Sequence, residues 1–180
     1  MISFLLVLFC LLSLLSIVWT SWRNGISPMP SSAPLRRAVA NEVNRLRGSG
    51  LIVEAGSGWG TLGIHLAKYC KDWRVIGIEN SPIPLRVSQL QARFSLGRSS
   101  KSRAAFQKGN IYTWSYADAD IVVCYLYPGA MQQLGSILHR GLRPGTCVIS
   151  VCFAIPNWTP EKVVVCRDLY RTKVYVYKVE

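Results

Sequence analysis

The chain has 180 residues, of which 50% are hydrophobic, and its 21 Lys and Arg against 9 Asp and Glu give a formal net charge of +12. Disordered chains combine low hydrophobicity with few aromatic residues, so a composition with 6 Trp, 8 Tyr and 5 Phe excludes disorder. This length predicts one domain. The apolar excess is concentrated at the N-terminus, because the run from Ile2 to Trp19 carries no charge.

The N-terminal segment 1–22 is long enough to cross a membrane, since a transmembrane helix needs about 20 apolar residues. A cleaved signal peptide is the alternative, but no Lys or Arg precedes the apolar run and no A-x-A cleavage site follows it. Trp19 and Trp22 suit a membrane interface, and Arg23, Arg36 and Arg37 follow on the C-terminal side. By the positive-inside rule, we expect a single-pass anchor with its N-terminus outside and the following domain in the cytoplasm.

The remaining chain alternates between strand-like and helix-like segments. Residues 23–34 form a predicted linker, because three prolines and three serines cannot continue a helix. Residues 35–180 form the predicted domain. Apolar residues recur at helical spacing in 35–46, 62–69, 83–94 and 130–139. Short apolar or β-branched runs predict strands at 51–55, 74–79, 104–107, 121–126, 147–153, 162–166 and 173–179.

This order of segments determines the predicted fold class. Strands that alternate with helices indicate an α/β fold, a Rossmann-like, doubly wound and mostly parallel sheet with helices on both faces. The last two strands are separated by only six residues, which predicts a C-terminal antiparallel hairpin. In the helix over 83–94, the apolar stripe is Ile83, Val87, Leu90 and Phe94.

The most specific motif follows the first predicted strand of the domain and reads Glu-Ala-Gly-Ser-Gly-Trp-Gly from Glu54 to Gly60. Glycines at alternate positions permit positive φ and let the backbone approach a ligand, to which the next helix presents its N-terminal N–H groups. Glu79 ends the second strand, where an acid accepts hydrogen bonds from ribose hydroxyls. The expected cofactor-binding residues are Glu54, Gly56, Ser57, Gly58, Trp59, Gly60, Glu79 and Asn80.

Two classes of cofactor use such a loop. Gly58, Gly60 and Gly63 satisfy the G-x-G-x-x-G pattern of dinucleotide sites, so NAD is one alternative. Glu54 favours S-adenosylmethionine, because that cofactor has a free ammonium group, whereas a carboxylate would repel a pyrophosphate. The sequence shows no spacing typical of metal ligands, and we therefore expect no metal site.

These motifs resemble those of the class I, seven-strand S-adenosylmethionine-dependent methyltransferases, over roughly residues 35–180. The run from Glu54 to Gly60 matches their acid-x-Gly-x-Gly-x-Gly pattern, and Glu79 matches their second-strand acid. The resemblance implies a sheet of seven strands that ends in an antiparallel pair. It also implies that Asn110, in a Gly-Asn-Ile stretch, occupies the position from which these enzymes contact the adenine amine.

From the fourth predicted strand onward, the chain resembles a narrower group, the lysine methyltransferases of the adenine nucleotide translocase and the ATP synthase c subunit, with their bacterial relatives. The resemblance rests on the stretches DIVVCYLYP (120–128) and FAIPNWTP (153–160) and on Met131. It implies a protein substrate, itself an integral membrane protein. Two positions depart from the group's pattern, because Trp59 stands where Asp is usual and Thr61 where a basic residue is common.

Methylation of lysine requires an uncharged amine held in line with the methyl donor. A free lysine has a pKa of about 10.4, so an apolar pocket beside a sulfonium would favour the neutral amine by desolvation and like-charge repulsion. Ligands of open α/β sheets bind at the carboxyl ends of the strands, and we therefore expect Tyr127 to orient the target amine. The other expected substrate-pocket residues are Tyr125, Pro128, Pro156 and Trp158.

Six basic residues and no acidic one lie in the stretch from Arg86 to Lys108. Anionic lipid headgroups and RNA phosphates are both suitable partners, and the anchor favours lipid over nucleic acid. The sequence as a whole predicts a membrane-anchored methyltransferase for protein lysine. A methyltransferase for RNA or a small molecule, and a non-catalytic domain that kept the fold, are the alternatives.

Overall fold

The computed structural model describes residues 2–25, 27, 29–46, 48–97 and 100–180. The helices of these residues are α1 (Ile2–Asn24), α2 (Ala33–Arg45), α3 (Thr61–Tyr69), α4 (Pro82–Leu96), α5 (Ser100–Arg103) and α6 (Pro128–Gly141). The strands are β1 (Gly50–Ala55), β2 (Trp73–Glu79), β3 (Ala104–Lys108), β4 (Ile121–Cys124), β5 (Cys147–Val151), β6 (Lys162–Val165) and β7 (Lys173–Lys178). Each predicted strand is present, with ends that differ by one or two residues.

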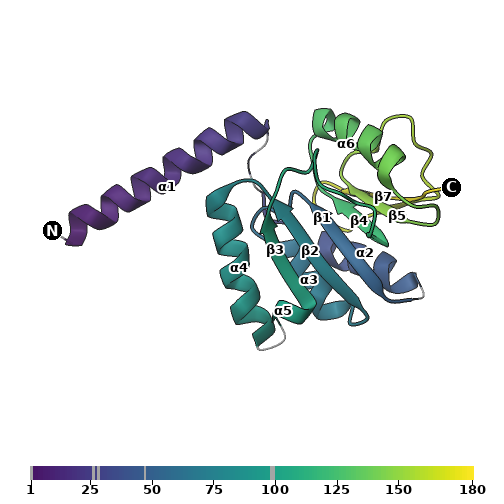
Figure 1. Ribbon diagram of the computed structural model, residues 1–180, viewed down its shortest axis with the longest axis horizontal. Coiled ribbons are helices and arrows are strands. Elements are labelled where there is room, and N and C mark those ends of the chain that lie inside the picture. Colours follow the sequence, from purple (N-terminus) through teal and green to yellow (C-terminus); the bar gives the residue numbers. More distant parts are fainter. Residues whose placement is uncertain (1, 26, 28, 47, 98–99) are drawn as a thin grey trace.

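The strands form one sheet in the order β3-β2-β1-β4-β5-β7-β6 (Figure 1). β1 to β5 are parallel, whereas β7 is antiparallel to both β5 and β6, so the predicted mixed sheet and its terminal hairpin are confirmed. β1 lies between β2 and β4, and the chain therefore leaves the centre of the sheet in opposite directions. At such a switch point the carboxyl ends of the strands leave a crevice in which ligands bind.

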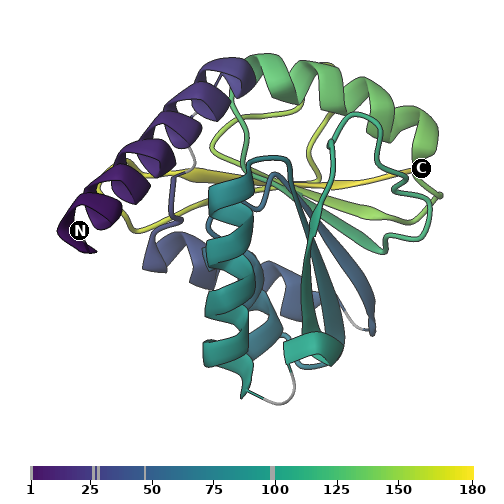
Figure 2. The same ribbon diagram turned by 60° about the vertical axis from the view of Figure 1, so that its left-hand side comes forward.

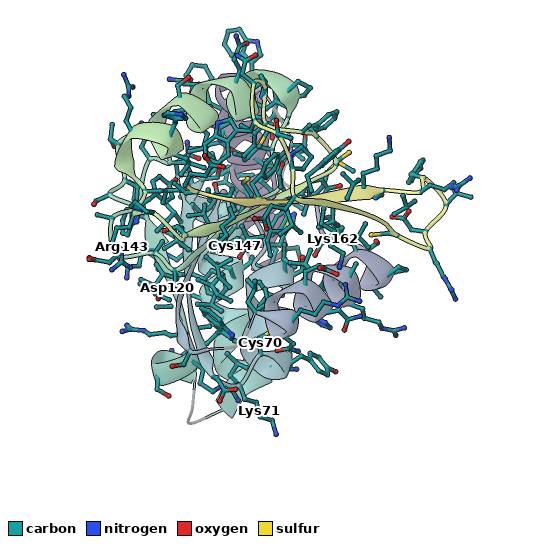
Figure 3. All side chains as sticks on the ribbon, turned by 90° about the vertical axis from the view of Figure 1, so that its right-hand side faces the viewer. Cys70, Lys71, Asp120, Arg143, Cys147 and Lys162 are labelled. Atoms are coloured by element: carbon teal, nitrogen blue, oxygen red, sulfur yellow. The ribbon has the colours of Figure 1, made fainter. Side chains whose placement is uncertain are left out.

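Helices cover both faces of the sheet. One apolar core joins residues of α2, α3 and α4 to one face, and a second core joins α6 to the other, where the chain between β3 and β4 also packs. Asp120, just before β4, links the amino ends of β1 and β4. Its carboxylate accepts a hydrogen bond of 2.8 Å from the backbone N–H of Leu51 and pairs with Arg143 at 3.3 Å (Figure 3). This edge of the sheet is opposite the crevice.

α1 extends away from the domain (Figures 1 and 2). Most of its apolar side chains are exposed. The segment Ser3–Trp22 has a mean hydropathy of 2.4 and none of it is buried. Its length and composition suit a membrane span and equally a signal sequence.

The apolar stripe of α4 does not face the sheet, although an apolar stripe normally marks the buried side of a helix. Leu85, Ser88 and Ala92 are buried against the sheet, whereas Leu90 and Phe94 of the stripe are 53% and 82% exposed. Small inner residues are required because the helix closely approaches the glycine loop. A Cβ at Gly60 would lie 2.6 Å from the Cβ of Ser88. Leu90 and Phe94 therefore point outward, and Leu85 is the longer apolar side chain of α4 that is buried against the sheet.

Candidate functional site

A cavity of about 540 Å³ opens at the carboxyl ends of β1, β2 and β4. Its size lies within the range usual for small-molecule sites. The residues predicted from the sequence that line this cavity are Glu54, Gly56, Ser57, Gly58, Glu79, Asn80, Asn110, Tyr125 and Tyr127. The fold thus brings together the glycine loop, the residues after β2 and the residues after β4.

The glycine loop makes a tight turn between β1 and α3. Gly56, Gly58 and Gly60 have φ of 74°, 50° and 75°, a region that favours glycine. A Cβ at Gly56 would lie 2.7 Å from Cδ2 of Leu126, so close packing also requires glycine there. The backbone N–H groups of Gly56 and Ser57 donate to the carbonyl of Ile78, at 3.0 and 2.9 Å. These bonds hold the loop against the end of β2.

Glu79 connects the loop to the residues that follow β2. Its carboxylate is 7% exposed and accepts hydrogen bonds from the backbone N–H groups of Gly58 and Ser81, each at 2.8 Å. A carboxylate has about four lone-pair sites, so both oxygens keep acceptor capacity on the cavity wall. Glu79 is therefore suited both to fix the loop and to accept hydrogen bonds from a ligand.

Glu54 is the most perturbed acid of the cavity. It is 4% exposed, and burial raises its pKa from 4.5 to about 8, with a further rise from the charge of Glu79 and an opposing effect of the Gly63 N–H. Its Oε2 and the Oγ of Ser57 have no hydrogen-bond partner within the part of the chain that the structure describes. Two orphaned polar atoms on one cavity wall fit a ligand with a polar or charged group.

Tyrosines form the wall beyond β4. Tyr127 precedes α6, and its side chain lies beside that of Tyr112 on the cavity wall. Burial and the neighbouring Tyr127 raise the pKa of Tyr112 above its usual value. Asn110 lies next to them, and its Oδ1 accepts a hydrogen bond of 2.9 Å from the backbone N–H of Tyr112. Burial also raises the pKa of Tyr125, so the hydroxyls of Tyr112 and Tyr125 are neutral at physiological pH.

Five predicted site residues lie outside the lining of the cavity: Trp59, Gly60, Pro128, Pro156 and Trp158. Gly60 is the N-cap of α3, and Pro128 begins α6, so both have local structural roles. Trp158 is half-buried and packs edge-on against Tyr177 of the second core, with ring centroids 5.7 Å apart.

The cavity also has a wall that the sequence did not indicate. Asn24, Ser27, Met29 and Ser31 of the predicted linker line it. The side-chain amides of Asn24 and Asn80 exchange two hydrogen bonds of 2.9 Å, and Ser31 bonds to Thr61 through both its N–H and its hydroxyl. Composition identified this stretch only as non-helical, and no motif in it signals a ligand site. Tyr112, Gln133 and Phe153 are further lining residues that sequence reasoning missed.

Residues 54–162 match the family described as the ANTKMT methyltransferase domain. The chain belongs to this family. It is an S-adenosylmethionine-dependent methyltransferase, and the NAD alternative raised by the G-x-G-x-x-G pattern is wrong. The seven-strand fold and the family resemblance predicted from the sequence are both confirmed.

Individual relatives of this methyltransferase agree with that assignment. A protein-lysine N-methyltransferase of Saccharolobus islandicus is 26% identical over 131 residues, which is 71% of this chain and 77% of the relative. The mouse adenine nucleotide translocase lysine N-methyltransferase is 29% identical over 82% of this chain and 67% of its own. The human lysine N-methyltransferase of the ATP synthase c subunit is 30% identical over 75% of this chain, which spans only 56% of that relative.

Among solved structures, an RNA methyltransferase of Salinibacter ruber in complex with S-adenosyl-L-homocysteine superposes with a TM-score of 0.69. It is 26% identical, over 84% of this chain and 94% of that one. The Oε2 of Glu54 and the hydroxyl of Ser57, which lack hydrogen-bond partners among the described residues, suit a ligand of the same class as S-adenosyl-L-homocysteine.

Proposed function

We propose that this methyltransferase modifies a lysine of a membrane protein. The observation that carries the proposal is the group of relatives named as protein-lysine N-methyltransferases, combined with a cavity whose wall continues directly into the apolar helix α1. Asn24, the last residue of α1, pairs with Asn80 at this cavity. If α1 is a retained anchor, as we propose, the site lies close to the membrane on the cytoplasmic side.

We propose that the cofactor lies along the loop and the end of β2. Glu54 and Ser57 would hold its ammonium group, because their oxygens lack partners in the described chain and an ammonium favours the ionised carboxylate. Glu79, with Asn80 beside it, would accept hydrogen bonds from the ribose hydroxyls. Asn110 would lie at the adenine, and the loop from Gly56 to Gly58 would let the backbone approach the ligand.

S-adenosylmethionine supplies a methyl group bound to a sulfonium sulfur. The leaving group is then a neutral thioether, which needs no acid to protonate it. The chain must therefore position the target lysine and favour its neutral form. The wall of Tyr112, Tyr125 and Tyr127 is largely apolar, with hydroxyls at the ends of the rings. Partial desolvation lowers the pKa of a lysine there, and the Tyr127 hydroxyl would orient the amine by accepting its N–H.

The membrane supplies the second part of the proposal. Basic residues of the stretch 86–108 would contact anionic headgroups, and each contact would contribute about 1 kcal/mol.

An RNA methyltransferase is the second candidate function, favoured by the likeness to the Salinibacter ruber protein and by the net charge of +12. The lysine assignment is preferred because the three sequence relatives are named for lysine.

Incubation of host membranes with the full chain and cofactor carrying a labelled methyl group tests this assignment. We expect label in a small membrane protein, recovered after hydrolysis as ε-N-methyllysine. Tyr127→Phe should lower the rate roughly 10- to 100-fold, which is typical of a lost positioning contact, with little change in cofactor affinity. Tyr170→Phe is the matched control, since Tyr170 is exposed and outside the cavity. Label confined to RNA or to small molecules would contradict the lysine assignment.

A further inference from the structure

Helix α4 has two apolar faces, of which only one is covered. The inner face packs on the sheet, whereas the outer face carries the stripe of Ile83, Val87, Leu90 and Phe94, of which Leu90 and Phe94 are exposed and Ile83 and Val87 are half-buried. These residues are spaced by four, three and four positions, so they lie on one side of a helix. A helix at the surface of a soluble domain normally carries polar residues on that side. Exposed apolar stripes of this kind mark interaction surfaces.

The charges beside the stripe indicate the chemistry of its partner. Arg86 and Arg93 are exposed on α4, and helical geometry places them along one border of the stripe. The chain has no Asp or Glu from residue 80 to residue 117. An apolar stripe bordered by arginines is typical of helices that lie in the interface of an anionic membrane.

The position of α1 adds an independent argument. α1 leaves the domain beside the N-terminal end of α4, and the two helices are in contact. In both views α1 and α4 lie on the same side of the domain, and α4 does not run along the direction of α1 (Figures 1 and 2). α4 therefore lies next to the proposed anchor, where its outer face can meet the same membrane.

We propose that the outer face of α4 docks onto an anionic lipid bilayer. Leu90 and Phe94 enter the boundary between headgroups and acyl chains, and Arg86 and Arg93 bind lipid phosphates. One apolar helix tethers a domain without fixing its orientation, whereas a second contact made by α4 holds the cavity in one orientation toward the membrane. The proposal rests on α1 as the anchor, but not on lysine as the methyl acceptor.

Labelling of a cysteine at position 94 tests the proposal in the full chain. Phe94→Cys, reconstituted at one copy per nanodisc of phosphatidylcholine and phosphatidylserine, is treated with a membrane-impermeant maleimide. Modification is measured peptide by peptide with mass spectrometry, so that native cysteines do not interfere. The matched control is Gln132→Cys on the exposed side of α6. We expect Cys at 94 to react at least about tenfold more slowly than Cys at 132. Adding Arg86→Glu and Arg93→Glu should remove most of this protection.

Equal reaction rates at the two positions in these discs would overturn the proposal. It would also be overturned if protection appeared only in discs with two copies, because the stripe would then cover a second chain. The labelling needs no methyl transfer, so its result is independent of the methyl acceptor.

Discussion

Replacing Glu79 with alanine is expected to weaken the binding of S-adenosylmethionine by more than about 100-fold. The carboxylate holds Gly58 and Ser81 through two charge-assisted hydrogen bonds, and we propose that it also accepts the ribose hydroxyls. Hydrogen bonds to a charged group contribute about 1.5 to 3 kcal/mol each, and about 1.4 kcal/mol is a factor of ten in affinity. Calorimetric titration of the full chain in mild detergent measures the change.

Two further variants make this titration interpretable. Glu161→Ala removes an exposed acid outside the cavity and should leave the affinity unchanged. Glu79→Gln keeps the shape but cannot accept both backbone bonds and the ribose as a carboxylate does, so we expect an intermediate loss. If Glu79→Ala, still folded by its thermal transition, binds within threefold of the unmodified protein, the ribose assignment is wrong.

Replacing Glu54 with glutamine is expected to change how stability depends on pH. The pKa of Glu54 is raised from 4.5 to about 8 in the folded protein, so the folded state binds an extra proton between these values. Stability contributed by the neutral acid is therefore present below about pH 4.5 and is lost as the pH rises to about 8. Above that pH, the buried carboxylate costs roughly 4 to 5 kcal/mol. Glutamine cannot ionise, and this loss should disappear.

Denaturant unfolding of both proteins at pH 5, 7 and 9 measures this effect. We expect the free energy of unfolding of Glu54→Gln, relative to that of the unmodified protein, to increase steadily with pH. Glu161→Gln serves as the control, because an exposed acid should give a small and flat difference. Parallel pH profiles for Glu54→Gln and the unmodified protein would show that Glu54 is already ionised when free of ligand.

The features that the sequence predicted correctly are those determined locally or by the topology of parallel sheets. The glycine loop requires positive φ at fixed positions, and that requirement is visible as glycine in the sequence. Glu54 and Glu79 lie at the ends of neighbouring parallel strands, whose carboxyl ends meet at one edge of the sheet. Tyr125 and Tyr127 follow β4, which is the other neighbour of β1, and they reach the same edge of the sheet.

The features that the sequence did not indicate depend on how elements pack. Periodicity identified α4 as a helix, but it could not show that small residues at Ser88 and Ala92 face inward. The linker contributes a cavity wall through the pairing of Asn24 and Asn80, which are distant in the sequence. An aromatic residue in a loop packs against a core as readily as it lines a pocket, and Trp158 packs against the second core.

Backbone amide hydrogen exchange of the full chain, with and without S-adenosylhomocysteine, tests the position of the cofactor most directly. We expect slower exchange in three segments that lie far apart in the sequence: Gly56–Gly58, Asn80–Ser81 and Met29–Ser31 of the linker wall. Peptides of β6 and β7, which lie outside the cavity, should be unchanged. A second, smaller hollow is lined by residues of α2 and α3, among them His65 and Tyr69. Protection confined to that hollow, with none at the glycine loop, would contradict the proposed site.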